Sequence, residues 1–247
     1  MKTKPVLFIR SLLFWLGFIV TTAFFGLLIL VLFFTPSDVR LRLARLWSYS
    51  NNVLLKVFCG IEFTVEGQDN LKKVETAIIL SKHQSTWETL ALHSFTPLAR
   101  WVFKRELMYI PIFGWALALT DPIALNRGAG RVAIKQLIKK GTQKLNDGKW
   151  LILFPEGTRT APGKTHKYKI GGALLAEKSG YPIIPIAHNA GEFWPRHSFI
   201  KWPGTISVVI GPAIQTEGRL ANDISQDVSD WIEETMKRIS DESRWNR

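Results

Sequence analysis

Two short polar blocks, about seventy residues apart, carry the side chains best suited to chemistry in this sequence. Residues 83–88 follow an apolar run at 76–80, and residues 154–159 follow another at 150–153. Each block begins where a buried strand should end, which is where α/β proteins place reactive groups. The first offers a base beside a carboxylate, and the second offers a glycine turn followed by an arginine. This combination predicts base-assisted attack on an activated carbonyl by a substrate that carries an anionic group.

In the first block, His83 lies five positions before Glu88. That spacing would turn the two side chains about 140° apart on one continuous helix, so they can meet only if His83 lies in a loop. A carboxylate on one ring nitrogen would then leave the other free to accept a proton. The same residues also match a capping box, with Ser85 as N-cap and Glu88 reaching back to its N–H. Taken alone, the block favours capping over catalysis.

Glycine and basic residues at the other strand ends change that balance. Gly157 permits a backbone bend and close approach by a ligand, and Arg159 offers a planar fork suited to phosphate or carboxylate. Lys104 and Arg105 follow another predicted strand, and Arg127 follows a fourth. Each of these is more often a solvated charge when taken singly. Gathered near one sheet edge, they would form an anion pocket.

In order and spacing, these blocks resemble the glycerolipid acyltransferases. That family's pattern is His-x4-Asp, a Lys/Arg-Glu-Leu block with later Pro and Gly, Phe-Pro-Glu-Gly-Thr-Arg, and a Pro-flanked apolar strand. The corresponding segments here are residues 83–88, 104–114, 154–159 and 182–187. The resemblance covers about residues 61–212, and the third segment is its most specific part. Glu88 stands where the family usually has Asp, so the carboxylate is kept on a side chain one methylene longer.

This resemblance implies an α/β fold and direct acyl transfer without a covalent acyl-enzyme. His83 would take the proton from the free hydroxyl of 1-acyl-sn-glycerol-3-phosphate (lysophosphatidic acid), which attacks an acyl thioester to give phosphatidic acid. Glu88 would orient His83, and the donor would be acyl-CoA or acyl carrier protein. The residues that the resemblance assigns to substrate binding are Lys104, Arg105, Arg127, Glu156, Gly157, Thr158 and Arg159.

The motif inventory agrees with chemistry that needs no metal and no bound organic cofactor. The sequence has no Gly-x-Ser-x-Gly elbow, no His-Glu-x-x-His zinc helix and no glycine-rich nucleotide loop. Its single cysteine, Cys59, excludes an intrachain disulfide and a cysteine metal cluster. We therefore expect neither a metal site nor a cofactor site.

A strongly basic composition indicates an anionic partner. The formal net charge is +12 and the isoelectric point is about 9.9. The basic residues are scattered and no nucleic-acid motif occurs, whereas a membrane segment does. An anionic membrane surface is therefore favoured over nucleic acid, with an acidic protein partner as an alternative.

The membrane segment is the uncharged run of twenty-four residues at 11–34. As a helix it would reach roughly 36 Å, enough to cross the hydrocarbon core. The residues that follow, Thr-Pro-Ser-Asp at 35–38, are typical of a helix stop and a new N-cap rather than a cleavage site. We expect attachment to the inner (cytoplasmic) membrane, with the catalytic part facing the cytoplasm. Basic residues on both sides leave open whether the segment spans the bilayer or embeds in one leaflet.

Apolar periodicity predicts the elements that position these residues. Strands are expected at residues 62–66, 76–81, 100–103, 122–125, 150–154, 183–187 and 205–210. Helices are expected at residues 37–58, 86–94, 112–119, 131–145, 172–179 and 223–240. Their alternation favours an α/β fold with a mostly buried mixed sheet flanked by helices. We expect two domains: residues 1–58, with the membrane helix and an amphipathic helix, and residues 59–247, the acyltransferase domain.

Three other functions stay open at this point. An enzyme of the same fold could act on another lysophospholipid or on an amino-lipid, and Glu88 in place of Asp keeps that alternative in view. A catalytically silent membrane protein could bind anionic lipid through its basic face. A membrane-anchored hydrolase would release free fatty acid without an acceptor lipid. Acyl-chain length and oligomeric state leave no signal in the sequence.

Overall fold

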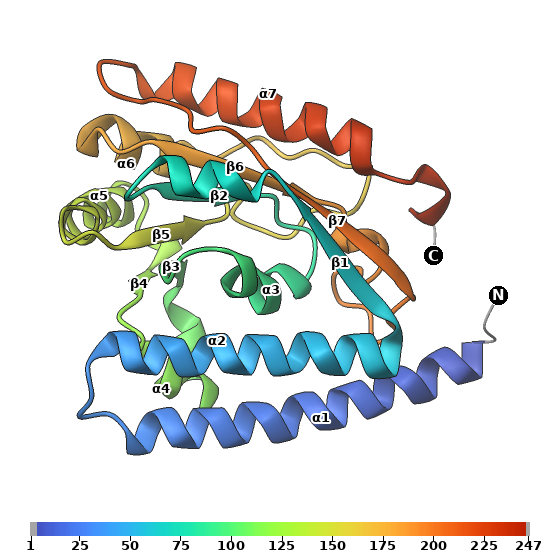
Figure 1. The fold of residues 1–247 in the computed structure, drawn as a ribbon. Coiled ribbons are helices and arrows are strands. Elements are labelled where there is room, and N and C mark those ends of the chain that lie inside the picture. The colour runs from blue at the N-terminus through green and yellow to red at the C-terminus, as the bar shows by residue number, and fades with distance from the viewer. Residues whose placement is uncertain (1–3, 246–247) are drawn as a thin grey trace.

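The computed structural model describes residues 4–245, except for the side chain of Arg127. Its centre is a sheet with strand order β1-β7-β6-β2-β5-β3-β4 (Figure 1). All neighbouring strands pair in parallel except β6 and β7, which are antiparallel, so the sheet is mixed, as predicted. The strands are β1 Ile61–Glu66, β2 Ile78–Ser81, β3 Ala99–Lys104, β4 Ile123–Leu125, β5 Trp150–Leu153, β6 Ile183–His188 and β7 Gly204–Ile210.

The central strands are buried on both faces. Every residue of β2, β5 and β6 is buried, whereas in the edge strand β1 only Ile61 is buried and the following positions alternate between exposed and partly exposed. Strands covered on both sides read as continuous apolar runs rather than as alternating patterns. This is why the runs before the two polar blocks were recognisable as strands.

Helices cover both faces of the sheet and divide the core in two. Ile78 and Leu80 of β2 pack into a core with α5, α6 and α7, while Ile79 packs into the opposite core with α3. Figure 1 shows α5, α6 and α7 on one side of the sheet and α3, α2 and α1 on the other. The helices are α3 Trp87–Phe95, α4 Phe113–Ala118, α5 Arg131–Asn146, α6 Gly171–Ser179 and α7 Ala221–Ile239.

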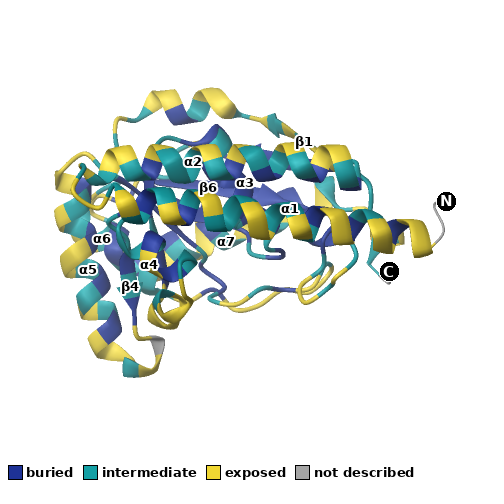
Figure 2. Cartoon of the chain, turned by 90° about the horizontal axis from the view of Figure 1, so that it is seen from below, coloured by how far each residue is buried: buried dark blue, intermediate teal, exposed yellow. Residues whose placement is uncertain are grey.

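Two long N-terminal helices lie side by side beneath α3 (Figures 1 and 2). They are α1 Lys4–Val31 and α2 Ser37–Leu54. Within residues 4–245, α1 is the helix long and apolar enough to cross a membrane, and 17% of its most apolar window is buried against the protein. The predicted helix over residues 37–58 is present, but its last turn, Leu55–Cys59, is a π-helix.

The start of α1 is fastened to the sheet domain through Lys201, a buried lysine. Its Nζ lies 3.8 Å from the ring centroid of Trp15, 4.6 Å from Trp194, 5.1 Å from Phe14 and 5.3 Å from Phe199. It also donates to the Phe199 carbonyl at 2.8 Å. Burial lowers the pKa of Lys201 to about 7. Two of these rings come from α1, so a cation–π cluster joins the N-terminal helix to the connection between β6 and β7. The predicted division into domains at residue 59 stays a prediction.

Candidate active site

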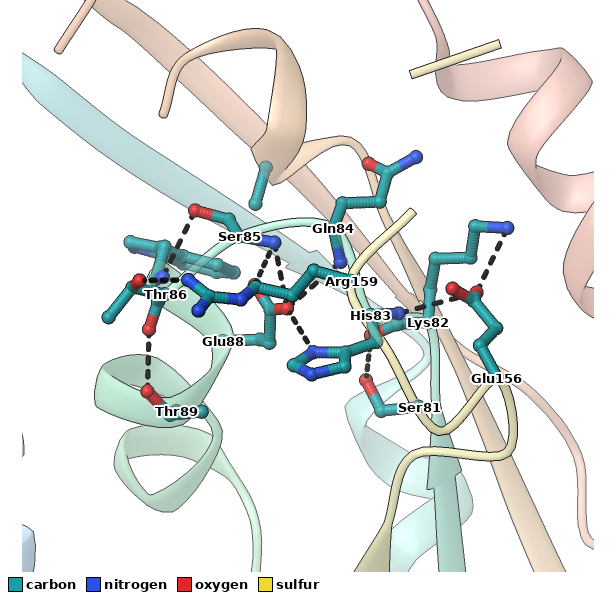
Figure 3. Close-up of polar contacts among 12 residues, drawn as sticks. Ser81, Lys82, His83, Gln84, Ser85, Thr86, Glu88, Thr89, Glu156 and Arg159 are labelled. Atoms are coloured by element: carbon teal, nitrogen blue, oxygen red, sulfur yellow. Dashed lines mark hydrogen bonds and ion pairs between the residues drawn. The ribbon is translucent and has the colours of Figure 1, made fainter. Parts of the chain in front are cut away.

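His83 and Glu88 meet where β2 ends and α3 begins (Figure 3). His83 lies in the connecting loop, Glu88 lies in the first turn of α3, and 2.7 Å separates His83 Nδ1 from Glu88 Oε1. The Glu88 carboxylate also accepts from the backbone N–H of Gln84 at 2.9 Å and of Ser85 at 2.9 and 3.0 Å. One carboxylate therefore makes both contacts that the sequence presented as alternatives, the contact with His83 and the return contact to Ser85.

The capping box predicted at the start of this helix is present. The hydrogen-bonded helix begins at Trp87, but Thr86 already has helical dihedral angles and makes no side-chain capping bond. Ser85 acts as the cap: its Oγ accepts from the N–H of Trp87 at 3.1 Å, while Glu88 accepts from the N–H of Ser85.

Electrostatics set the tautomer of His83. Burial acts to raise the pKa of Glu88, but the hydrogen bonds with His83 and with the backbone N–H of Ser85 hold it below its usual value. An ionised carboxylate can only accept, so His83 donates its Nδ1–H to Glu88. The ring of His83 stacks on Phe154 with centroids 4.0 Å apart and planes 10° apart, which restricts its rotation. With Nδ1 held as the donor, Nε2 is the ring nitrogen that can accept a proton from a substrate.

A second histidine, His188, contacts the backbone of this loop from the neighbouring strand β6. His188, at the end of β6, is fully buried, and its Nε2 lies 2.8 Å from the carbonyl oxygen of Lys82. Burial lowers the pKa of His188, so it stays neutral and donates Nε2–H to that carbonyl. Sequence reasoning missed this contact because β6 and β2 are neighbours only in the folded sheet.

The second polar block forms a turn after β5. Gly157 has φ of +70°, and an added Cβ would lie 2.8 Å from Lys169 Cε, so the turn requires glycine. Its N–H closes the turn on the Phe154 carbonyl at 3.1 Å. Arg159, two residues on, donates from Nη1 to Thr86 Oγ1 at 2.8 Å, and the N–H of Thr160 donates to the His83 carbonyl at 2.7 Å. The two blocks are therefore joined by direct hydrogen bonds.

Glu156, in the same turn, faces the protein interior. Its side chain is 0% exposed and its Oε1 lies 3.0 Å from Lys82 Nζ. Its Oε2 accepts from the Thr160 hydroxyl. Burial raises the pKa of Glu156 to about 7, against the opposing effect of the Lys82 charge. This predicted substrate-binding residue does not line the cavity.

The other predicted binding residues differ in whether they line the cavity beside His83. Lys104 lines the same cavity as His83, with its side chain 54% exposed and paired to Glu106 at 3.3 Å. Arg105 is exposed and does not line the cavity. The backbone of Arg127 begins the short helix η4, Arg127–Ala129, after β4, and its side chain lies outside the described part of the structure.

A cavity of about 970 Å³ opens beside His83. Its lining includes His83, Lys104, Gly157, Thr158 and Arg159. The rest of the lining is mainly apolar and comes from α1, α2, β3 and the segment around α4, with side chains such as Phe18, Trp47, Val102, Phe113 and Leu117. A large, mostly apolar cavity with a few polar and charged groups suits a ligand that has a charged head and an apolar body.

No group of three or more His, Cys, Asp or Glu side chains within residues 4–245 is arranged to hold a metal ion. A neutral imidazole with a free nitrogen, oriented by a buried carboxylate, can act as a general base. Arg159, whose Nη1 lies 2.8 Å from Thr86 Oγ1, also lines the cavity and can bind an anionic group.

Comparison with known proteins gives the context of this site. Residues 62–189 match the Acyltransferase family model. The chain is 48% identical to the 1-acyl-sn-glycerol-3-phosphate acyltransferase of Pseudomonas aeruginosa, over 76% of this chain and 74% of that protein. It is 28% identical to chloroplastic LPAT1 of Arabidopsis thaliana, named as the same enzyme, over 78% of this chain and 53% of that protein, and so spans about half of that relative's length.

A solved structure shares the fold along nearly the whole chain. The crystal structure of the 1-acyl-sn-glycerophosphate (LPA) acyltransferase PlsC from Thermotoga maritima superimposes with a TM-score of 0.78 at 23% identity, covering 97% of each chain. The predicted fold class, a mixed sheet flanked by helices with a long apolar N-terminal helix, is confirmed.

Proposed function

The chain belongs to the Acyltransferase family, and from this premise we propose that it is a 1-acyl-sn-glycerol-3-phosphate acyltransferase. It esterifies the free hydroxyl of lysophosphatidic acid with a fatty acyl group from acyl-CoA or acyl carrier protein, and it releases phosphatidic acid and the free thiol. The observation that carries the proposal is the 2.7 Å contact between His83 and Glu88 beside a mostly apolar cavity that His83, Arg159 and Lys104 line.

In this reaction His83 acts as the general base. Its Nε2 takes the proton of the acceptor hydroxyl while the hydroxyl oxygen attacks the thioester carbonyl carbon. The tetrahedral intermediate then collapses, the carbon–sulfur bond breaks, and the imidazolium returns the proton to the leaving thiolate. Glu88 stabilises the imidazolium because its buried, ionised carboxylate accepts the hydrogen bond from Nδ1–H.

The phosphate of the acceptor is held by the basic rim of the cavity. Arg159 supplies a planar fork for two phosphate oxygens and Lys104 supplies a second positive charge. Lys104 is favoured over Arg105 because it lines the cavity and Arg105 does not. Arg127 follows β4, the strand next to β3, and completes the set. Thr158 and Gly157 line the same cavity and bring backbone groups close to the substrate.

The apolar part of the cavity accepts acyl chain, and the outer faces of α1 and α2 attach the protein to a membrane. Figure 2 shows exposed residues along the side of these helices that faces away from the domain. On α1 they include Phe8, Leu16 and Phe24, which are 50%, 53% and 61% exposed. Because α1 packs along α2 instead of projecting from the domain, we favour embedding in one leaflet on the cytoplasmic side over a full crossing.

An acceptor panel tests this function. The purified chain is incubated with acyl-CoA or acyl-loaded carrier protein and with lysophosphatidic acid, a choline lysolipid, an amino-lipid or no acceptor, and both thiol release and lipid product are measured. We expect thiol release coupled to phosphatidic acid formation with lysophosphatidic acid. Preference for another acceptor, fatty acid release without an acceptor, or no thiol release would support the same-fold enzyme, the hydrolase or the silent binder, respectively.

A further inference from the structure

Three ionisable side chains meet in the interior directly behind the active site. Lys82 Nζ lies 3.0 Å from Glu156 Oε1 and 2.7 Å from Glu233 Oε1. The side chains of Lys82, Glu156 and Glu233 are 1%, 0% and 21% exposed. Figure 3 shows Lys82 and Glu156 pointing toward each other on the side of the loop away from Glu88. We call these three residues the interior ion cluster.

The cluster joins the two chain segments on which the proposed chemistry depends. Lys82 is the residue before His83, and Glu156 lies three residues before Arg159. Glu156 Oε1 also accepts from the backbone N–H of His83 at 3.4 Å, while the N–H of Thr160 donates to the His83 carbonyl at 2.7 Å. Both backbone polar groups of His83 are thus bound by the segment that carries Arg159.

Glu233 brings in a third part of the chain. It lies on α7 and accepts from the Tyr168 hydroxyl at 2.9 Å as well as from Lys82. Tyr168 is buried and follows Arg159 in the long connection between β5 and α6. The family model ends at residue 189, so α7 lies outside the matched region. A C-terminal helix therefore contributes a charge to the support of both catalytic segments.

The burial of these charges gives the cluster its rigidity. Removing an ion from water costs several kcal/mol, and only close partners offset that cost. Loss of one partner leaves the others buried and unpaired, so each member holds the others in place. The hydroxyl groups of Tyr168 and Thr160 and the backbone N–H of His83 supply further donors to the two carboxylates. Such a network has one well-satisfied arrangement.

We propose that Lys82 and Glu233 are positioning residues, which through Glu156 fix the segment of His83 relative to the segment of Arg159. The inference rests on the proposed function, in which His83 serves the acceptor hydroxyl and Arg159 serves the phosphate of the same molecule. A base and an anion site that each remain intact but move apart would still bind substrate, yet would hold it in an unproductive position.

Glu233→Gln tests the inference with little change in volume. Glutamine keeps an oxygen that can accept from Tyr168 and Lys82 but removes the charge, and Glu233 is partly exposed, so the variant should fold. Its neighbour Glu234 is exposed on the same helix, and Glu234→Gln is the matched control. Per folded enzyme, we expect kcat of Glu233→Gln to fall about 10-fold, below the 10²-fold that a misplacement of 1 Å can cost. The KM for lysophosphatidic acid should change less than about two-fold, because each binding group persists.

Lys82→Met provides a second measurement, with Lys82→Arg as its conservative counterpart. Lys82→Met should lower kcat by at least as much as Glu233→Gln, and Lys82→Arg should restore part of it because the positive charge returns. If Lys82→Met does not fold, Glu233→Gln alone decides. The inference is overturned if Glu233→Gln matches Glu234→Gln in kcat and KM, or if its activity falls only in proportion to the folded protein lost, as judged by the melting temperature.

The proposed function is tested separately in the same assay. Failure of wild-type protein to acylate lysophosphatidic acid, or full activity of His83→Ala, would sink the proposed function. A normal wild-type enzyme with an inactive His83→Ala variant and an unaffected Glu233→Gln variant would sink only the positioning role of the cluster.

Discussion

Arg159 Nη1 donates a hydrogen bond of 2.8 Å to Thr86 Oγ1, and Thr86 lies directly before α3, the helix that carries Glu88. The proposed phosphate ligand is therefore tied to the same turn that holds the proposed base. A substrate phosphate can compete for this guanidinium without breaking an ion pair, because the hydroxyl of Thr86 is a neutral partner. Arg159 is therefore held in place and can still bind an anionic group.

His83→Ala should abolish nearly all acyl transfer while the fold persists. Loss of a positioned general base typically costs about 10²- to 10⁴-fold. Turnover and melting temperature are measured together, and His166→Ala, at an exposed histidine, is the control. Near-normal turnover in a folded His83→Ala variant would mean that another group supplies the base.

Glu88→Gln should depress turnover by about 10²-fold or more, because an amide no longer stabilises the imidazolium or enforces the Nδ1–H tautomer of His83. Glu88→Asp should keep substantial activity, since a carboxylate remains on a side chain one methylene shorter. Both changes should lower stability by about 1–3 kcal/mol, because buried donors lose an acceptor at its present position. Wild-type turnover in Glu88→Gln would assign Glu88 to helix capping alone.

Arg159→Ala should weaken the use of lysophosphatidic acid, and Arg159→Lys should restore only part, because an ammonium keeps the charge without the fork. Lys104→Ala should act in the same direction, while Arg105→Ala should be close to neutral, since Lys104 lines the cavity and Arg105 does not. The KM for acceptors with and without phosphate is the measurement. Equal effects on both acceptor types would contradict the assignment.

Removal of residues 1–36 should release much of the protein from vesicles and also lower its activity on dispersed substrates. The first effect follows from loss of the exposed apolar face of α1. The second follows because Phe18 and other α1 side chains line the cavity. Flotation on neutral and anionic vesicles is compared with turnover in detergent. Unchanged binding to neutral vesicles would show that α1 is not the principal anchor.

Glu156 should make stability depend on pH in a definite direction. Its pKa is raised from 4.5 to about 7, mainly by burial, so the folded state binds the proton more tightly than the unfolded state. The stabilisation that comes from protonated Glu156 is therefore complete below the unfolded-state pKa of 4.5. It is lost as the pH rises through the folded-state pKa of about 7. Unfolding by denaturant across this window should show a smaller decline with pH for Glu156→Gln than for wild type. An unchanged decline would remove Glu156 as its source.

Sequence reasoning predicted the elements of the sheet domain well because the local signals were strong. All seven expected strands are present with boundaries within two residues, since buried runs such as those of β2 and β5 end at recognisable turns. The contact between His83 and Glu88 was expected from the resemblance to the glycerolipid acyltransferases, whereas the local spacing alone favoured helix capping; the structure contains both contacts.

Contacts between distant segments could not be predicted in the same way. His188 meets the Lys82 carbonyl only because β6 pairs with β2, and Glu233 meets Lys82 only because α7 packs over that part of the sheet. The order of strands in a mixed sheet is set by global packing, and no local pattern encodes it.

Because of the aromatic cluster around Lys201, α1 could not be exchanged for another apolar helix without loss of specific side-chain contacts. An anchor that only tethered a catalytic domain could be replaced by any apolar helix of similar length. Here Phe14 and Trp15 surround a specific buried cation while the next turn of α1 contributes Phe18 to the cavity wall. A chimaera that carries a foreign apolar helix in place of α1 would lack both the contacts around Lys201 and this part of the cavity wall. Substitutions in α1 are therefore constrained by the same side-chain complementarity that constrains the core.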